Sequence, residues 1–100
     1  MNIKLENSDD KDLPVFSKRL REARLRLGIS QAKLGIAANI DEFSASARMN
    51  HYEKGKHYPD YKTAERLAKA LNVPTPYLFA REDDLAEWIL QFKQQASVKT

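Results

Sequence analysis

Apolar residues recur at every third or fourth position from Val15 onward, which is the spacing of one face of an α-helix. The first apolar stripe consists of Phe16, Leu20, Ala23 and Leu27. Gly28 follows directly, and glycine readily adopts the left-handed backbone conformation that ends many helices. The pattern therefore predicts a first helix over residues 15–27.

A second, short helix is predicted over residues 31–38. Ser30 is suited to cap it, because a serine hydroxyl accepts a free backbone N–H of the first helical turn. Asn39 tolerates a left-handed conformation and is expected to end it. Gly35 would weaken an isolated helix by about 1 kcal/mol relative to alanine. Its position between apolar residues at core spacing instead indicates a close crossing with another helix.

After a connection over residues 41–44, a third helix is predicted over residues 45–54. Met49 and Tyr52 are three residues apart and are expected to face inward together. Gly55 is expected to end this helix, for the same conformational reason as the glycine after the first helix.

A fourth helix is predicted over residues 61–71, and its apolar face consists of Ala64, Leu67, Ala68 and Leu71. Asn72 is expected to end this helix, and Pro74 prevents it from continuing because proline lacks the N–H that a helix interior needs. Thr75 is suited to cap a short fifth helix over residues 77–79.

A last helix over residues 83–95 begins with two aspartates, which suit the positive end of the helix dipole. Its apolar positions are Leu85, Trp88, Ile89 and Phe92. Such a stripe can pack on its own domain or pair with a second subunit, and aromatic residues are frequent at the centres of interfaces. Both alternatives stay open at this stage. Phe43, in the connection before the third helix, also has two alternatives: its side chain can fill the core or remain exposed.

The length of 100 residues and a hydrophobic content of 42% indicate one domain with a core of its own. The helical periodicity, with few glycines and prolines, predicts an all-α fold. The chain is divided into a flexible N-terminal tail (1–13), a helical domain (14–80), a C-terminal helix for packing or dimerisation (81–96) and a short tail (97–100).

Positive charge is concentrated in the middle of the chain. Residues 14–80 carry twelve lysines and arginines against six acids, whereas both flanking segments are net acidic. With a pI near 9.2, this distribution favours a polyanionic partner such as nucleic acid. The densest basic cluster lies on the first helix and consists of Lys18, Arg19, Arg21, Arg24 and Arg26. A solvated helix face has the same composition, so most of this cluster is assigned to solubility and long-range attraction.

Several classes of protein are not expected from this composition. The absence of cysteine excludes disulfides, thiolate zinc sites and cysteine nucleophiles, and it favours a reducing compartment. No apolar run has the length of a membrane span and no signal peptide is present, so a cytoplasmic protein is expected. His51, Glu53 and His57 straddle a helix end and a glycine turn, so they do not converge on a metal. No enzyme activity, metal or cofactor is therefore expected.

Three motifs occur in a fixed order along the chain. They are LRxxRxxxGxSQ at residues 20–31, Glu–x–Gly–Lys at residues 53–56 and RLAKALNVP at residues 66–74. In this combination the chain resembles the phage-repressor-like helix-turn-helix family, which includes lambda repressor, lambda Cro and the 434 repressor. The resemblance spans residues 15–79. It implies a five-helix DNA-binding domain, here with an added C-terminal helix.

The resemblance also implies roles for individual residues. Arg24 and Glu53 correspond to an ion pair that ties the first helix to the end of the third, recognition helix, and a buried arginine needs such a partner. Gly55 would let the backbone after the recognition helix approach DNA closely. The candidate contacts to DNA phosphates are Gln31, Lys54, Lys56, His57 and Lys62.

The chain departs from the family pattern near residues 41–44, where it is about four residues longer. Aligned backward from Glu53, the recognition helix offers these candidates for reading base edges: Ser46, Ala47, Arg48, Asn50 and His51. Arginine can bind guanine, asparagine can bind adenine, and alanine can contact the thymine methyl group. Arg48 is the preferred candidate for guanine, with a phosphate contact or plain solvent exposure together as an equal alternative. For His51, a solvated ring is the alternative.

The predicted function is sequence-specific binding of double-stranded DNA by a transcriptional regulator, namely a repressor that occupies operator DNA as a homodimer. Two-fold dimers read two half-sites about one helical turn apart, and the apolar stripe of helix 83–95 supplies the candidate dimer contacts. The alternative is a protein-interaction module, such as the antitoxin of a toxin–antitoxin pair. In that case the acidic segment 1–13 and helix 83–95 are the candidate surfaces for a protein partner.

Overall fold

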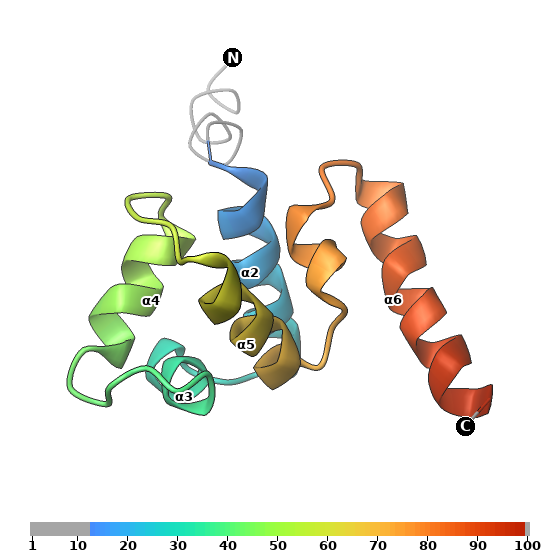
Figure 1. Ribbon diagram of the computed structural model, residues 1–100. Helices are drawn as coiled ribbons and strands as arrows, with labels where there is room; N and C mark the ends of the chain where they lie inside the picture. The colour runs from blue at the N-terminus through green and yellow to red at the C-terminus, as the bar shows by residue number, and fades with distance from the viewer. Residues whose placement is uncertain (1–12, 100) are drawn as a thin grey trace, which may run out of the picture.

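The computed structural model describes residues 13–99, and these residues form helices and turns without any β-strand. The elements are α2 (Val15–Leu27), α3 (Gln31–Ala37), α4 (Ala45–Glu53), α5 (Tyr61–Leu71), the 3-10 helix η1 (Thr75–Phe79) and α6 (Asp83–Lys99). In Figure 1, α2 runs through the middle, with α3 and α4 on one side and η1 and α6 on the other. The all-α prediction is confirmed. The predicted N-terminal tail lies outside the described residues except for Leu13.

Helix α2 has the predicted bounds. Gly28 follows it with φ of 77°, and its backbone N–H donates to the carbonyl oxygens of Arg24 and Leu25. The predicted apolar stripe is buried at Phe16, Leu20 and Ala23. The prediction that Leu27 belongs to this buried stripe is wrong, because Leu27 is 48% exposed. The stripe ends early because Ile29, just beyond the helix, packs against the core.

Helices α3 and α4 cross at very short range, and Gly35 permits this. A Cβ atom at Gly35 would lie 2.9 Å from the Cβ of Ala45 and 3.1 Å from the Cγ of Met49. Such distances are shorter than ordinary van der Waals contacts, so any side chain at this position would push α4 away. The interpretation of Gly35 as a packing residue is therefore confirmed, and the position of α4 depends on it.

The ends of α3 follow from capping. The Ser30 hydroxyl oxygen accepts the backbone N–H of Lys33 at 3.0 Å, as predicted. Asn39 has φ of 69°, so the chain turns there through the expected left-handed residue. The longer connection then leads to α4 and holds Phe43, which is 93% exposed. Of the two alternatives for Phe43, exposure is the correct one.

Helix α5 also has the predicted bounds, and Asn72 ends it with φ of 60°. The short helix after it differs from the prediction. It is a 3-10 helix that already begins at Thr75, and no side chain caps it. The backbone N–H of Tyr77 donates to the carbonyl oxygen of Pro74 at 3.0 Å. This bond spans three residues, so it closes a tight 3-10 turn that includes Thr75.

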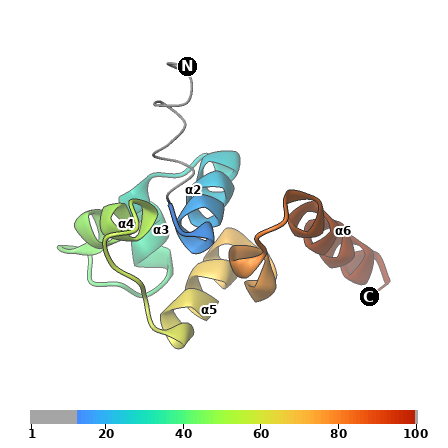
Figure 2. The ribbon, with the colours of Figure 1, turned by 90° about the horizontal axis from the view of Figure 1, so that it is seen from above.

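Helix α6 runs to Lys99, past the predicted end at residue 95, and so takes in residues 97–99, which were assigned to a tail. Figure 2 shows it beyond η1, on the side away from the α3–α4 pair. Ala86 is buried, and Ile89 packs against the core. The other candidate interface residues, Leu85, Trp88 and Phe92, are exposed in the single chain.

A buried arginine holds the start of α6 in place. Arg19 is 3% exposed, and its Nε donates to the carbonyl oxygen of Ala80 at 2.9 Å. Its Nη2 donates to the carbonyl oxygen of Arg81 at 3.1 Å and to the carboxylate of Asp83 at 2.9 Å. Burial lowers the pKa of Arg19, but its hydrogen bonds to Asp83 and Glu22 outweigh this effect and raise the pKa overall. The sequence analysis gave Arg19 no structural role, so this anchor was not predicted.

Candidate nucleic-acid interface

A buried ion pair joins α2 to the end of α4. The Arg24 Nε lies 2.5 Å from Glu53 Oε2, and its Nη2 lies 3.0 Å from Oε1. The side chain of Glu53 is 3% exposed and that of Arg24 is 11% exposed. The remaining Nη1 donates to the carbonyl oxygen of Ile29 at 2.9 Å. Hydrogen bonding to Glu53 raises the pKa of Arg24, and this outweighs the opposite effect of burial.

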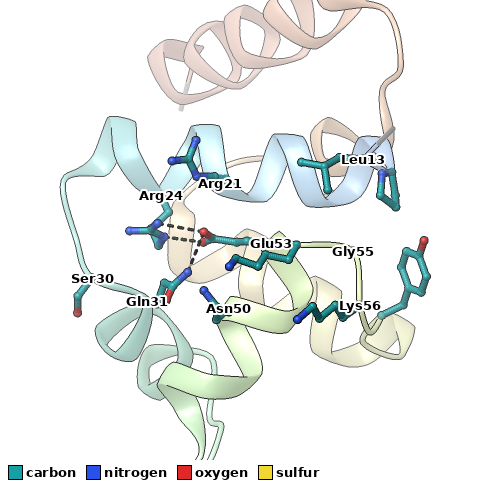
Figure 3. A pocket seen from close by; sticks show the side chains of 12 residues that line it. Leu13, Arg21, Arg24, Ser30, Gln31, Asn50, Glu53, Gly55 and Lys56 are labelled. Atoms are coloured by element: carbon teal, nitrogen blue, oxygen red, sulfur yellow. Dashed lines mark hydrogen bonds and ion pairs between the residues drawn. The ribbon is translucent and has the colours of Figure 1, made fainter. Parts of the chain in front are cut away.

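Gln31 joins the same carboxylate from a third helix. Its Nε2 donates to Glu53 Oε1 at 3.1 Å, and Gln31 is the first residue of α3. Figure 3 shows the three side chains meeting at one point, where dashed lines connect them. Because α2, α3 and α4 each contribute one side chain, the hydrogen bonds fix the position of α4 relative to both neighbours.

An open cleft lies beside this junction, between α2, the start of α3 and the end of α4. Besides Arg24, its cationic residues are Arg21 of α2 and Lys54 and Lys56 of the loop after α4, and these three are exposed. Glu53 is the only acid among the lining residues, and Arg24 neutralises its charge. The cleft therefore presents positive charge to an approaching anion.

The loop after α4 is held firmly against the start of α2. Gly55 has φ of 73°, and a Cβ atom there would lie 2.8 Å from Pro14 Cδ. The backbone N–H of Lys56 donates to the carbonyl oxygen of His51 at 2.9 Å. Glycine is needed here both for its backbone conformation and for the close approach. The lysines on either side of it are thereby kept at the rim of the cleft.

The other two phosphate candidates lie elsewhere. His57 is exposed, and its ring centre is 5.0 Å from that of His51 in an edge-to-face arrangement. Lys62 is exposed in the first turn of α5. Neither residue lines the cleft. The structure thus brings together three of the five predicted phosphate contacts, namely Gln31, Lys54 and Lys56.

The base-reading candidates occupy more than one side of α4. The buried face consists of Ala45, Met49, Tyr52 and Glu53. Ser46, Ala47 and Arg48 are exposed, whereas Asn50 and His51 are half-buried. Asn50 lines the cleft, but Arg48 Nη2 donates to the hydroxyl oxygen of Tyr52 at 3.1 Å. Helix positions two residues apart do not share a face, so Arg48 and Asn50 project from different sides of α4.

The sequence and the fold are similar to those of known proteins. A family model of the helix-turn-helix domain matches residues 17–84. This chain belongs to the helix-turn-helix family. The crystal structure of the transcriptional regulator BswR is similar to this helix-turn-helix protein, with 52% sequence identity and a TM-score of 0.73. The similarity covers 77% of this chain and 76% of that one. No curated protein matches the sequence.

The family match fits the arrangement of helices. It runs from within α2 to the first turn of α6, so it contains the ion-pair junction and the whole of α4. The predicted resemblance to helix-turn-helix transcriptional regulators is thereby confirmed. Most of α6 lies beyond the matched residues.

Arg21 is a cleft residue of this helix-turn-helix protein that the sequence analysis did not select. It was grouped with the basic cluster of the first helix and given no individual role. A signal was available, however, because Arg21 lies three residues before Arg24 and so shares its side of the helix. Helical spacing alone would have placed it next to the predicted ion pair.

Within residues 13–99, no helix has the length and apolar character needed to cross a membrane. In the same residues, histidines and acids do not gather in a group of three or more that could hold a metal ion.

Proposed function

We propose that this helix-turn-helix protein is a repressor that binds specific double-stranded DNA as a homodimer, with α4 in the major groove. The main support is the junction of Arg24, Gln31 and Glu53, because it fixes α4 next to a cationic cleft. In this docking mode the recognition helix enters the groove while its partner helix lies across the backbone. In this proposal α4 is the recognition helix and α3 is the helix that lies across the backbone.

The cleft is proposed to hold the DNA backbone. Arg21, Lys54 and Lys56 would contact phosphate oxygens, and each contact releases condensed counterions from DNA. Gln31 would donate from the start of α3 to the same backbone. These contacts supply affinity and set the register of α4, but they carry no sequence information.

Base edges are proposed to be read from the outer surface of α4. Ser46, Ala47 and Asn50 would face the strand that runs past the cleft, because Asn50 lines it. Arg48 and His51 would face the other wall of the groove. Asparagine suits adenine and arginine suits guanine, and the bond of Arg48 to the Tyr52 hydroxyl would keep its guanidinium close to the helix.

The dimer is proposed to form through the exposed face of α6. Leu85, Trp88 and Phe92 are 44%, 68% and 62% exposed, which is unusual for large apolar residues spaced along one side of a helix. A second copy of the same helix would cover them around a two-fold axis. Such a dimer reads two half-sites about one helical turn apart, roughly 34–36 Å.

The test is selection of DNA fragments by the purified protein at near-physiological salt, followed by sequencing of the retained fragments. The expected result is a palindrome whose half-sites are centred about 10 base pairs apart, together with a dimeric mass in solution. Retention of random fragments with no shared sequence would contradict sequence-specific binding. A recovered single half-site and a monomeric mass would contradict the dimer.

A second function, binding of a protein partner as an antitoxin does, is favoured by the same exposed α6 residues. The two functions make different predictions for the variant Trp88→Ala. Loss of dimeric mass and of palindrome binding supports the repressor dimer. A variant that still dimerises, but no longer co-purifies with the product of an adjacent reading frame, supports the antitoxin.

A further inference from the structure

Phe43 is the most exposed large apolar residue of the described chain. It lies between α3 and α4, and 93% of its surface is accessible. An aromatic side chain left in water gains nothing for folding, because its stabilising contribution comes from burial. Contacts within its own chain therefore give no reason for a phenylalanine at this position.

The turn that carries Phe43 is well ordered by hydrogen bonds. The backbone N–H of Phe43 donates to the carboxylate of Asp41 at 3.0 Å. The backbone N–H of Ser44 donates to the carbonyl oxygen of Asp41 at 3.0 Å, and the Ser44 hydroxyl donates to the same oxygen at 3.3 Å. Ile40 anchors the start of the turn in the core. The aromatic ring thus projects from a defined backbone.

The turn leads directly into α4. Ser44 is the residue before the helix, with φ of −112° and ψ of −3°, and its carbonyl oxygen accepts the N–H of Arg48 at 2.9 Å. Counting back from Asn50 in helical steps of three and four gives Ala47 and then Phe43. Phe43 therefore lies next to the N-terminal end of α4, one helical spacing before Ala47.

We propose that Phe43 determines specificity by contacting the C5-methyl group of a thymine in the major groove. This inference rests on the proposed function. The N-terminal residues of a recognition helix are the ones that contact base edges, and Phe43 precedes that end of α4. The thymine methyl is the apolar group among the base edges of the major groove, and phenylalanine is among the side chains that contact it. The longer connection would then enlarge the reading surface.

The test uses the DNA site recovered by selection and replaces each thymine in turn by deoxyuridine, which lacks only the methyl group. Binding of the wild-type protein is expected to weaken about fourfold at one thymine, as the loss of one buried methyl group implies. Phe43→Ala is expected to bind the unmodified site about tenfold or more weakly. At that thymine, the variant is expected to show no further loss on deoxyuridine substitution.

Leu25→Ala is the matched control, because Leu25 is a 53% exposed apolar residue on α2 that does not line the cleft. It is expected to bind like the wild type. Phe43→Leu keeps an apolar side chain and should retain part of the thymine preference. Because Phe43 is so exposed, the circular dichroism spectrum and melting curve of Phe43→Ala should match those of the wild type.

Three results would overturn the inference. An unchanged affinity of Phe43→Ala, with an unchanged deoxyuridine profile, would place Phe43 away from the bases and leave the proposed function intact. An equal loss of affinity for the selected site and for random DNA would indicate that Phe43 contacts the DNA backbone instead of a base. If the wild-type protein selects no DNA sequence at all, the proposed function fails and this inference fails with it.

Discussion

The α3–α4 pair and α6 are attached to the domain by different kinds of contact. At the α3–α4 crossing, Gly35 brings the two backbones so close that a single methyl group would not fit. Helix α6 instead buries Ala86, packs Ile89 against the core, and is held at its start by Arg19. Helix α4 is therefore part of the core, whereas α6 is an attached element with an exposed apolar face. Changes in the first region should alter the whole domain, and changes in the second should act locally.

The largest effect is expected for Glu53→Ala. This change leaves Arg24 without its charge partner at a buried site, and loss of one member of a buried ion pair costs about 3–5 kcal/mol. The free energy of unfolding, measured in urea, should fall by that amount. Glu65→Ala is the matched control, since Glu65 is exposed on α5, and it should change stability by less than about 0.5 kcal/mol. A cost for Glu53→Ala as small as that of the control would show that the junction does not stabilise the fold.

A smaller effect is expected for Gly35→Val, which inserts a branched side chain against Ala45 and Met49. Overpacking of a tight core contact costs about 1–3 kcal/mol. Ala45→Gly removes the methyl group that such a side chain would meet first. In urea unfolding, the double variant Gly35→Val with Ala45→Gly should therefore lose less free energy of unfolding than the sum of the two single losses. Strictly additive losses would mean that the two positions are not in contact.

The smallest effect on stability is expected at the start of α6 when the pH is lowered. The hydrogen bond from Arg19 holds the pKa of Asp83 below its ordinary value of 3.8. A carboxylate with a lowered folded-state pKa stabilises the fold above its unfolded pKa, and that contribution is lost as the pH falls through the folded value. The protection of α6 amides, taken relative to their intrinsic exchange rate at the same pH, should therefore fall below about pH 4.

Asp83→Asn should remove this pH dependence and weaken the attachment of α6 at neutral pH as well. Asp84→Asn is the control, because the Asp84 carboxylate accepts only the backbone N–H of the next residue. It should keep the acid transition of the wild type. If Asp83→Asn keeps it too, the transition belongs to other carboxylates.

Sequence patterns predicted the fold well where a local signal exists. The ends of α2 and α5 were placed correctly because Gly28 and Asn72 stop a helix through their own backbone conformation. The junction of Arg24 with Glu53 was found through a family resemblance. Arg19 was missed because its partners include backbone carbonyl groups about sixty residues away, and every residue carries such a group. A donor that binds main-chain oxygens leaves no pattern in the sequence.

The outer surface of α4 was predicted only in part. The residues that face away from the core follow from helical spacing, and all five candidates lie outside the buried face. Their division between two sides of the helix follows from the same spacing, but the bond from Arg48 to the Tyr52 hydroxyl and the position of Asn50 in the cleft do not. Phe43 could not be assigned either, because a turn residue has no helical register until the turn is known.

The most direct test of the central claim is the salt dependence of binding to the selected DNA site. Lys56→Ala removes a charge at the rim of the cleft, and Lys69→Ala removes the same charge from α5, outside the cleft. If the cleft holds DNA phosphate, Lys56→Ala weakens binding to all sequences alike and lowers the slope of log K against log salt by about one unit. Lys69→Ala leaves the slope unchanged. Equal slopes for Lys56→Ala and the wild type would contradict the claim that the cleft beside α4 holds the DNA backbone.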